Sequence, residues 1–454
     1  MQHSRLARIF RGLSRQIETV GIEAIPECER RMSPWRYFLV WFMASSSATT
    51  PLIGHLLFPL GLQDMLLAMV CALLWGVLPA GLVTLMGRKA PLSALVIARR
   101  PFGNHGAMFL SALFTMINVV WFGLNSEVAG ELLSASLPGG KTTWVALVGV
   151  IQTVLVLFGM HLLQAIYQIT FWFLLVVLGG LACVLAMSPG LTWRAMQSVP
   201  ASGIQSMPFA EGVAVILNFS LFAWTYKLST VSRFCRPQGA MAGYFMAAPV
   251  GIMISMALMA MLGFMAELAT GSWNPGLLVV HWPIMGPVVA CLLGLTIIQT
   301  NALNLYPSTI DALVCVRTFR PAQWWQEPMA TVTLGLLATA AALGGILSRI
   351  SGLLAWVEHL VIPFTCILLL DWYGFGGHRL PVDTYLCYDN PRYHTAGCLA
   401  FVLSVVASLA LHGQLPYHFQ AWLPQPVAVF MLTAIIYIFA NYLIGSKVRP
   451  ERAT

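Results

Sequence analysis

Thr-Ile-Ile-Gln-Thr-Asn-Ala-Leu-Asn-Leu-Tyr-Pro-Ser-Thr-Ile-Asp, residues 296–311, is a polar segment at the end of a long hydrophobic run. Burying an amide side chain without a hydrogen-bond partner costs several kcal/mol. Asn301 and Asn304 are three residues apart, so a membrane helix places both amides on roughly one face. We therefore expect a polar group to meet this face.

The composition of the chain is that of a polytopic membrane protein. Its 454 residues are 58% hydrophobic and 9% charged, with a mean hydropathy of +0.79, whereas soluble proteins are about 25% charged. Runs long enough to span a bilayer recur along the whole length, and no soluble domain fits between them. We predict twelve transmembrane helices, at about 36–58, 65–86, 107–136, 142–160, 163–187, 209–229, 240–267, 282–306, 328–347, 352–373, 395–412 and 424–444.

The basic residues gather on one predicted side of the membrane. With both termini in the cytoplasm, twelve spans place 21 of the 24 Lys and Arg inside and leave Lys141, Arg194 and Arg349 outside. This is the positive-inside bias. The net charge of +8 therefore reflects topology, and we expect no nucleic-acid partner.

No signal peptide, disulfide or metal site is expected. The first 35 residues lack a short apolar core followed by a small-residue cleavage site, which a signal peptide needs. The nine cysteines form neither a CxxC motif nor a Cys/His cluster, so they read as free thiols. We expect no cofactor other than a coupling ion.

Two predicted helices carry interruptions. In the first, Ala44-Ser45-Ser46-Ser47-Ala48-Thr49-Thr50-Pro51 ends in proline, which removes a backbone hydrogen bond from a helix. Freed carbonyls at membrane depth bond neighbours, water or an ion, so this is either a kink rescued by hydroxyl groups or part of an ion site. The sixth span mixes aromatic and small polar residues over 217–226. Interruptions at matching places predict an inverted-repeat transporter with a midplane site.

The third span holds Trp121 and Asn125, which are four residues apart and lie on one helical face. A Trp ring offers a flat surface for a planar heterocycle, and Asn offers both a donor and an acceptor. Packing between helices would explain the same pair. Both interpretations stay open.

Ionisable groups inside membranes usually face the bundle interior and mark pathways or proton relays. Glu127 could bind a base N–H, carry a coupling proton or pair with another helix. Glu131 is a further candidate in the same span. The others are expected to be solvated near extracellular ends (Glu211, Glu358, His359), structural near cytoplasmic ends (Asp311, Asp371), or a cap or packing group after the first break (His55).

Short motifs follow one another in order over about residues 17–400 of the chain. These are Gly21-Ile-Glu-Ala-Ile-Pro-Glu, Pro34-Trp35-Arg36, Arg100-Pro-Phe-Gly103, Trp121-Phe-Gly, Ser232-Arg233-Phe234, Thr300-Asn301-Ala-Leu-Asn304-Leu-Tyr306 and Leu370-Asp371-Trp372-Tyr373. Together they resemble the nucleobase:cation symporter family, the purine/cytosine permeases.

The resemblance implies an all-α LeuT-like fold of two inverted five-helix repeats plus two further helices. We expect a cytoplasmic arm at 1–34, repeats at 35–187 and 188–373, and the two added helices with a cytoplasmic tail at 374–454. It also implies the residues that bind the substrate: Trp121, Asn125, Phe219, Ser220, Phe222, Asn301 and Asn304.

For the cation, the resemblance implies the carbonyl groups of Ala44 or Ser45 and the hydroxyls of Thr296 and Thr300. Two departures from the family pattern bear on coupling and gating. Thr230 stands where the family usually has Asp before the Ser232-Arg233 pair, and Gln299 stands where a small hydroxyl residue often helps to bind sodium. Glu127, Thr230 and Arg233 are the candidates for proton transfer or gating.

The leading hypothesis is import of a nucleobase or similar small planar heterocycle by Na⁺ or H⁺ symport with alternating access. The alternatives are symport of an amino acid, allantoin, a hydantoin or a vitamin precursor on the same fold, and, in other classes, a membrane-embedded enzyme, a channel or a sensor. An enzyme is disfavoured because the spans hold no metal cluster or nucleophile–base pair at suitable spacing. We expect a multi-pass protein of the plasma (cell inner) membrane, in contact with the lipid bilayer and with no obligate protein partner.

Overall fold

The computed structural model describes residues 17–188, 191–199, 207–274, 276, 284–345, 350–387, 391–411 and 423–444, with the side chains of 350–358 excepted. These residues form helices, and the one β-bridge among them joins Met32 to Cys235. The membrane helices are α2 (Pro34–Ser45) with α3 (Leu52–Leu56), α4 (Leu62–Lys89), α6 (Arg99–Ser136), α7 (Lys141–Leu157), α8 (Gly159–Ala186), α10 (Phe209–Phe219) with α11 (Leu221–Ser232), α12 (Met241–Thr270), α13 (Met285–Arg317), α14 (Gln326–Leu343), α15 (Ile350–Leu369), α17 (Thr395–Leu411) and α19 (Gln425–Ile444).

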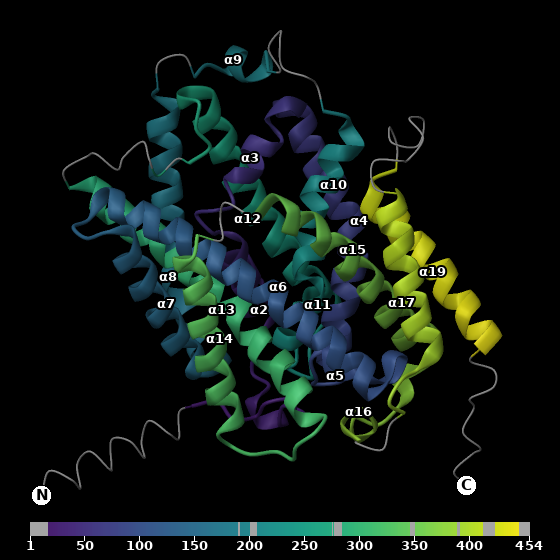
Figure 1. The fold of residues 1–454 in the computed structure, drawn as a ribbon. Helices are drawn as coiled ribbons and strands as arrows, with labels where there is room; N and C mark the ends of the chain where they lie inside the picture. The colour runs from purple at the N-terminus through teal and green to yellow at the C-terminus, as the bar shows by residue number, and fades with distance from the viewer. Residues whose placement is uncertain are drawn as a thin grey trace, which may run out of the picture.

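Each predicted hydrophobic run thus contains a helix or a broken pair of helices. Short helices lie at the two ends of the bundle: α9 (Trp193–Gln197) at the upper end of Figure 1, and α5 (Ala94–Ile97) and α16 (Asp383–Leu386) at the lower end. Helix α6 packs along α13 through the middle of the molecule, with α7 and α8 on one side. Helices α17 and α19 pack on each other and on α15 at the opposite side (Figure 1).

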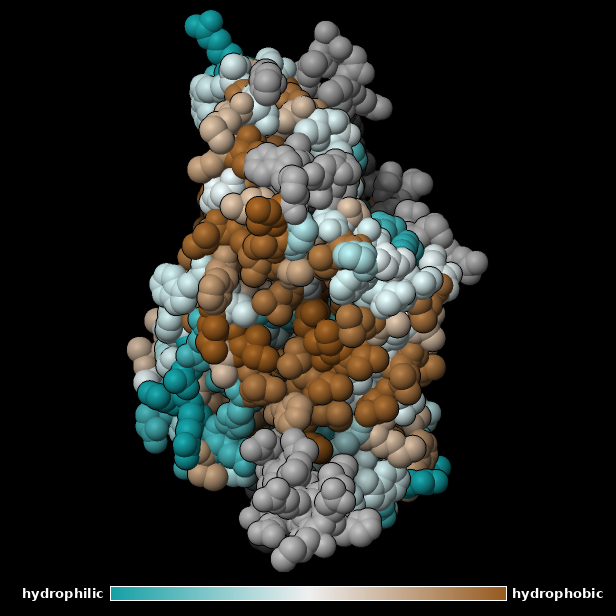
Figure 2. Space-filling view, turned by 90° about the vertical axis from the view of Figure 1, so that its left-hand side faces the viewer, coloured by the Kyte–Doolittle hydropathy of each residue, from teal (hydrophilic) through white to brown (hydrophobic). Residues whose placement is uncertain are grey.

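The outer surface is apolar around the middle of the molecule. Figure 2 shows one face on which hydrophobic residues fill the central part and hydrophilic residues gather toward the ends. Large apolar side chains such as Leu74, Trp172 and Val176 are exposed on the outside of the helices. This is the surface expected of helices that contact lipid tails.

Both predicted interruptions are present. Helix α2 ends at Ser45 and α3 begins at Leu52. At this break the Ser46 hydroxyl donates to the Phe42 carbonyl at 2.7 Å, and the Thr50 hydroxyl donates to the Ser45 carbonyl at 2.9 Å. Hydroxyl groups therefore satisfy carbonyls that the first break frees. The second break is a single residue, Ser220, whose φ of −112° and ψ of −97° separate α10 from α11.

The described part of the N-terminal arm lies against one end of the bundle. The backbone of Met32 pairs with the segment after α11, donating to the Phe234 carbonyl and accepting from the Arg236 N–H, both at 3.1 Å. Buried Arg30 donates to the carbonyls of Cys235 and Arg88. These contacts hold the described part of the arm against the bundle.

Helices α3 and α12 touch through their backbones. A Cβ atom on Gly263 would lie 1.9 Å from the Pro51 carbonyl oxygen, and one on Gly54 would lie 2.0 Å from the Ala260 carbonyl oxygen. Glycine at both positions lets the helix after the first break approach α12. The same two helices are also joined by His55 and Glu267, at 3.0 Å.

Gly263→Ala is expected to destabilise the protein by roughly 1–3 kcal/mol, because the backbone of Pro51 has to move to admit a methyl group. The measurement is the thermal unfolding midpoint of the purified protein in detergent. Gly179→Ala in α8 is the matched control, since a Cβ atom there meets nothing within 4 Å. Equal midpoints for the two variants would contradict the close packing of α3 on α12.

Candidate functional site

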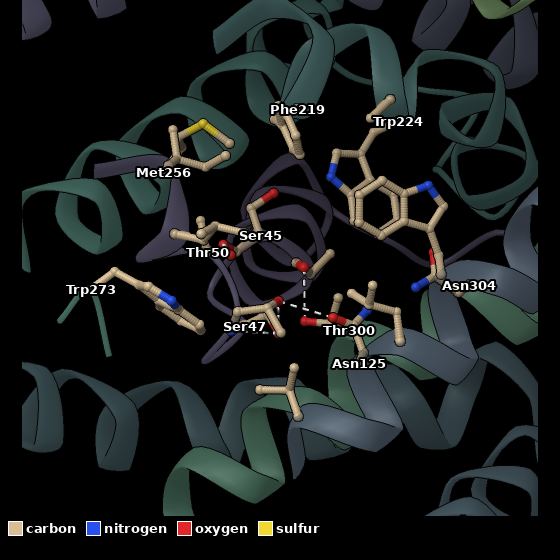
Figure 3. A pocket seen from close by; sticks show the side chains of 18 of the residues that line it. Ser45, Ser47, Thr50, Asn125, Phe219, Trp224, Met256, Trp273, Thr300 and Asn304 are labelled. Carbon is tan, nitrogen blue, oxygen red and sulfur yellow. Dashed lines mark hydrogen bonds between the residues drawn. The ribbon is translucent and has the colours of Figure 1, made fainter. Parts of the chain in front are cut away.

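A cavity of about 160 Å³ lies between the two helix breaks and the central pair α6 and α13. Figure 3 shows side chains from several helices pointing into it. Its lining joins hydroxylated, aromatic and amide residues with apolar residues and two charged ones: Ala44, Ser45, Ser47, Thr49, Thr50, Leu52, Ile53, Trp121, Leu124, Asn125, Val128, Glu131, Phe219, Ala223, Trp224, Lys227, Met256, Trp273, Thr300 and Asn304.

Aromatic rings form the walls of this cavity. Trp121 of α6 and Phe219 at the end of α10 meet edge to face, with ring centroids 6.3 Å apart and an interplanar angle of 83°. Trp224 of α11 adds a third ring, and Trp273 lies across the cavity from it (Figure 3). A flat heterocycle inserted here would find ring faces and edges to pack against.

Three amide side chains form a connected group at one side of the cavity. The Asn301 Oδ1 accepts from the Asn125 amide at 3.0 Å and from the Asn304 amide at 3.2 Å. The Asn301 amide itself donates to the Phe122 carbonyl and the Ser126 hydroxyl, at 2.9 and 3.2 Å. Asn301 is therefore occupied by protein partners and orients the other two amides.

Asn125 and Asn304 are the amides that reach the cavity. The Asn125 Oδ1 also accepts from the Thr49 hydroxyl at 2.9 Å, which ties α6 to the first break. An amide nitrogen has two N–H donors, and the described part of the chain engages one at each of these two residues. The second donor can meet an acceptor on a ligand.

Three of the residues predicted to bind substrate are outside the cavity lining. Asn301 lies behind the amides that it orients. The Ser220 hydroxyl donates to the Ile216 carbonyl of α10 at 2.5 Å. The Phe222 ring faces Phe430 of α19, at a centroid distance of 6.4 Å. Trp121, Asn125, Phe219 and Asn304 do line the cavity.

Lys227 is a cavity residue that the sequence analysis missed. Its position falls within the predicted span 209–229, but positive-inside counting took it as one of the basic residues on the cytoplasmic side; α11 continues to Ser232, and Lys227 is buried, 2% exposed. Its Nζ donates to the Asn304 Oδ1 at 2.8 Å and lies 4.3 Å from the centroid of the Trp224 ring. The signal available in the sequence was its place one helical turn after Ala223 and Trp224, on the face that lines the cavity.

The predicted cation ligands lie where α13 meets the first break. The Thr300 hydroxyl donates to the Ala44 carbonyl at 2.9 Å. The Thr296 hydroxyl donates to the Leu293 carbonyl at 2.6 Å and accepts from the Ala48 N–H at 3.1 Å. These hydroxyls therefore hold the backbone of the break. The Ser45 hydroxyl is buried without a hydrogen-bond partner among the described residues.

Gln299 points away from this group of oxygens. Its amide donates to the Thr170 hydroxyl of α8, and its backbone carbonyl accepts from the Tyr167 hydroxyl at 2.8 Å. The donor set left for sodium is a few neutral hydroxyl and carbonyl oxygens, most of them already bonded to one another. A hard cation needs several oxygen ligands, and the Thr300 and Thr296 hydroxyls are engaged with backbone groups in this conformation, which leaves few oxygens for sodium.

The acidic residues of α6 are paired with a lysine. Lys141 Nζ donates to the Glu127 carboxylate at 2.8 Å and to the Glu131 carboxylate at 2.6 Å. Glu127 is buried and Glu131 lies in the cavity lining, near the end where Trp273 is found. Of the three alternatives for Glu127, this geometry favours a structural ion pair.

The opposite end of the cavity is sealed by a second layer of contacts. Arg233 is fully buried and donates to the Gly21 carbonyl at 2.8 Å and to the Tyr306 hydroxyl at 2.7 Å. The Tyr306 hydroxyl donates to the Glu18 carboxylate at 2.6 Å, and Glu18 also lies 3.7 Å from Arg233. Thr230 is buried one turn earlier in α11. The carboxylate that faces Arg233 thus comes from the N-terminal arm. Thr230 of α11 has no carboxylate to offer.

The sequence model of one protein family, described as permease for cytosine/purines, uracil, thiamine, allantoin, matches residues 24–445. The chain is 22% identical over 413 residues to "Putative purine-cytosine permease YxlA" of Bacillus subtilis, a match that covers 87% of this chain and 88% of that protein. A shorter match, 32% identical over 139 residues, covers 29% of this chain and 24% of the vitamin B6 transporter TPN1 of Saccharomyces cerevisiae.

Solved structures share the fold at low identity. Mhp1, a nucleobase-cation-symport-1 family transporter, in a closed conformation with bromovinylhydantoin bound, superposes with a TM-score of 0.79 and 15% identity, covering 96% of this chain and 98% of that one. A Na⁺-coupled sialic acid symporter in an outward-open state gives a TM-score of 0.66 and 12% identity, covering 97% and 94%. These similarities confirm the predicted LeuT-like architecture.

Tyr306→Phe removes the hydroxyl that joins Arg233 to Glu18 and is expected to loosen the arm's end of the cavity. In membrane vesicles whose outer surface presents the arm's end of the bundle, a cysteine introduced at cavity residue 223 (Ala223→Cys) should then react several-fold faster with a charged maleimide, after subtraction of labelling in the parent protein. Tyr373→Phe is the control, since its hydroxyl bonds the Leu82 carbonyl at a separate, exposed place. Unchanged labelling in Tyr306→Phe would show that this hydroxyl does not hold the seal.

Proposed function

Because the chain belongs to the family of permeases for cytosine/purines, uracil, thiamine and allantoin, we propose that it imports a nucleobase-like planar heterocycle together with a proton. It is a multi-pass membrane protein and a secondary transporter of the nucleobase type that works by alternating access; it is not an enzyme. The chemical class of the substrate ring, the identity of the coupling ion and the orientation of the protein in the membrane are the parts that we propose.

One observation carries the proposal for the substrate: two oriented amides share a cavity with four aromatic side chains. Asn301 fixes the Asn125 and Asn304 amides through its own bonds to α6. An amide edge can donate to a ring carbonyl or nitrogen and accept from a ring N–H. The rings of Trp121 and Phe219 would cover the faces of the same ligand. A small planar heterocycle matches both sets of groups.

The contacts at the two ends of the cavity support the direction of access. The arm's end, where Glu18 and Arg233 meet, is rich in basic residues, including Arg30, Arg88 and Arg236. By the positive-inside rule this end is cytoplasmic, which puts the described start of the chain inside. The conformation is then closed toward the cytoplasm, with Trp273 and Glu131 at the outer end. We propose the plasma (cell inner) membrane as the location.

We propose a proton as the coupling ion, and Asp311 as the group that holds it. The residues at the first break leave few oxygens for sodium, as described above. Asp311 lies on α13 two turns beyond Asn304, is 2% exposed, and has one carboxyl oxygen, Oδ2, that is buried without a hydrogen-bond partner among the described residues. An intramembrane carboxyl group of this kind is a candidate proton carrier.

Uptake measurements test the substrate proposal. Cells that express the chain should accumulate at least one radiolabelled heterocycle from a panel of nucleobases, allantoin, hydantoins and pyridine or pyrimidine vitamin precursors. Trp121→Ala and Asn304→Ala should each lower the initial rate at least about tenfold, equivalent to about 1.4 kcal/mol. Trp172→Ala is the matched control, because this ring is 64% exposed on the lipid-facing surface. Unchanged uptake in both cavity variants would show that the substrate binds elsewhere.

Ion substitution tests the coupling proposal. Replacing Na⁺ by choline should leave the initial uptake rate unchanged, whereas a protonophore should abolish accumulation. Asp311→Asn should remove the response to an imposed pH gradient while facilitated exchange of substrate persists, because the amide is neutral whatever the pH. Uptake that depends on Na⁺ and ignores the protonophore would overturn this proposal.

A further inference from the structure

We propose that Lys227 makes this cavity selective for heterocycles that carry an acidic group, namely a carboxylate or an acidic ring oxygen or imide that ionises near neutral pH. The inference rests on the proposed function and narrows its substrate class. It starts from the position of one ammonium group inside the bundle.

Lys227 has few and uncharged contacts for a buried cation. Its Nζ donates one hydrogen bond, to the Asn304 Oδ1 at 2.8 Å. It also lies over two aromatic rings, 4.3 Å from the centroid of Trp224 and 5.5 Å from that of Tyr226. An ammonium group has three N–H donors and no acceptor. One of its donors therefore meets an amide, and the rest face rings and the cavity.

The charged groups around the cavity leave Lys227 without a close counter-ion. Within the described part of the chain, no carboxylate oxygen lies within 4.0 Å of its Nζ. Asp311 interacts with it only at longer range. Glu131, the carboxylate in the cavity lining, is bound to Lys141 at the outer end. A buried cation without a partner is strongly unfavourable, so an anion that enters this cavity would supply the missing charge.

The amide beside Lys227 strengthens this selection. The Asn304 Oδ1 is directed at Lys227, and its amide donates to Asn301, so the groups nearest the ammonium present N–H donors to the cavity. A carboxylate or ring oxyanion accepts such donors, and charge-assisted hydrogen bonds are roughly twice as strong as neutral ones. An exocyclic amino group would meet these donors with another donor. Amino-substituted rings should therefore bind less well than oxo- or carboxyl-substituted rings.

The same arrangement links anion binding to the proposed coupling. When Asp311 holds a proton, the carboxylate charge that acts on Lys227 at longer range from α13 disappears. The ammonium group then has its full charge available for the substrate. A proton on Asp311 and an anion on Lys227 enter together without net charge.

A pair of ligands that differ only in charge provides the test. Uracil-6-carboxylate and its carboxamide have the same ring and nearly the same size. With purified protein in detergent at pH 7, the carboxylate should bind at least about tenfold more tightly than the carboxamide, a difference of about 1.4 kcal/mol. In the same assay, xanthine and urate should bind more tightly than adenine and cytosine. Wild-type protein alone gives this result, whether or not any variant folds.

Variants of Lys227 complete the test. Lys227→Met keeps an unbranched side chain one atom shorter and removes the charge, so the ratio of the carboxylate and carboxamide affinities should fall to about one, a result that does not depend on how tightly the variant binds either ligand. Lys227→Arg should keep the preference. Lys89→Met, at the exposed end of α4, is the control for removal of a lysine elsewhere. Equal binding of the two ligands by wild-type protein, or a carboxylate preference that survives Lys227→Met, would overturn the inference.

The outcomes separate the inference from the proposed function. If the protein binds and transports neutral heterocycles as well as or better than acidic ones, the inference fails and the proposed function stands. If no heterocycle of either kind binds or is taken up, the proposed function itself fails, and the inference fails with it.

Discussion

The hydrogen bonds between α13 and the break of α2 and α3 are the interaction on which the rest of the site depends. A helix that stops in the middle of a membrane leaves carbonyl and N–H groups that no water can satisfy. Thr300 donates to the Ala44 carbonyl, and Thr296 accepts from the Ala48 N–H. Because these short side chains hold the open backbone, the break can line a cavity, and α13 must lie close enough to bring its amides to the same place.

The amides follow from that constraint. Once Thr300 is fixed against the break, Asn304 is one helical turn further along α13 and faces the same cavity. Asn301 lies on the side of α6, where Ser126 and the Phe122 carbonyl occupy its amide. The polar segment of α13 therefore divides its side chains between two helices. Hydroxyl groups meet α2, one amide meets α6, and one amide faces the space between them.

The spans, the breaks and four residues of the cavity lining, Trp121, Asn125, Phe219 and Asn304, were predictable from the sequence. Hydropathy places helices because a bilayer admits no exposed backbone, and proline with small hydroxylated residues marks the first break. Side-chain direction was harder to predict. Asn301 serves as an internal partner, because the three residues from Asn301 to Asn304 turn the side chain by 300° rather than a full circle. Phe222 points to α19. Lys227 was counted among the cytoplasmic basic residues because a charge near the end of a hydrophobic run resembles a flanking residue. The role of Glu18 was also inaccessible, since its contacts join segments far apart in the chain.

The approach of α3 to α12 has a consequence for movement. At Gly54 and Gly263 two backbones touch directly, with no side chains between them that could change rotamer. Such a joint cannot slide by small steps, so α3 and α12 should travel as one solid piece. The joint between α2 and α13 is of the other kind, made of hydroxyl groups that can exchange one carbonyl for another. The second half of the broken helix, α3, is therefore held rigidly to its neighbour α12, whereas the first half, α2, can shift against α13.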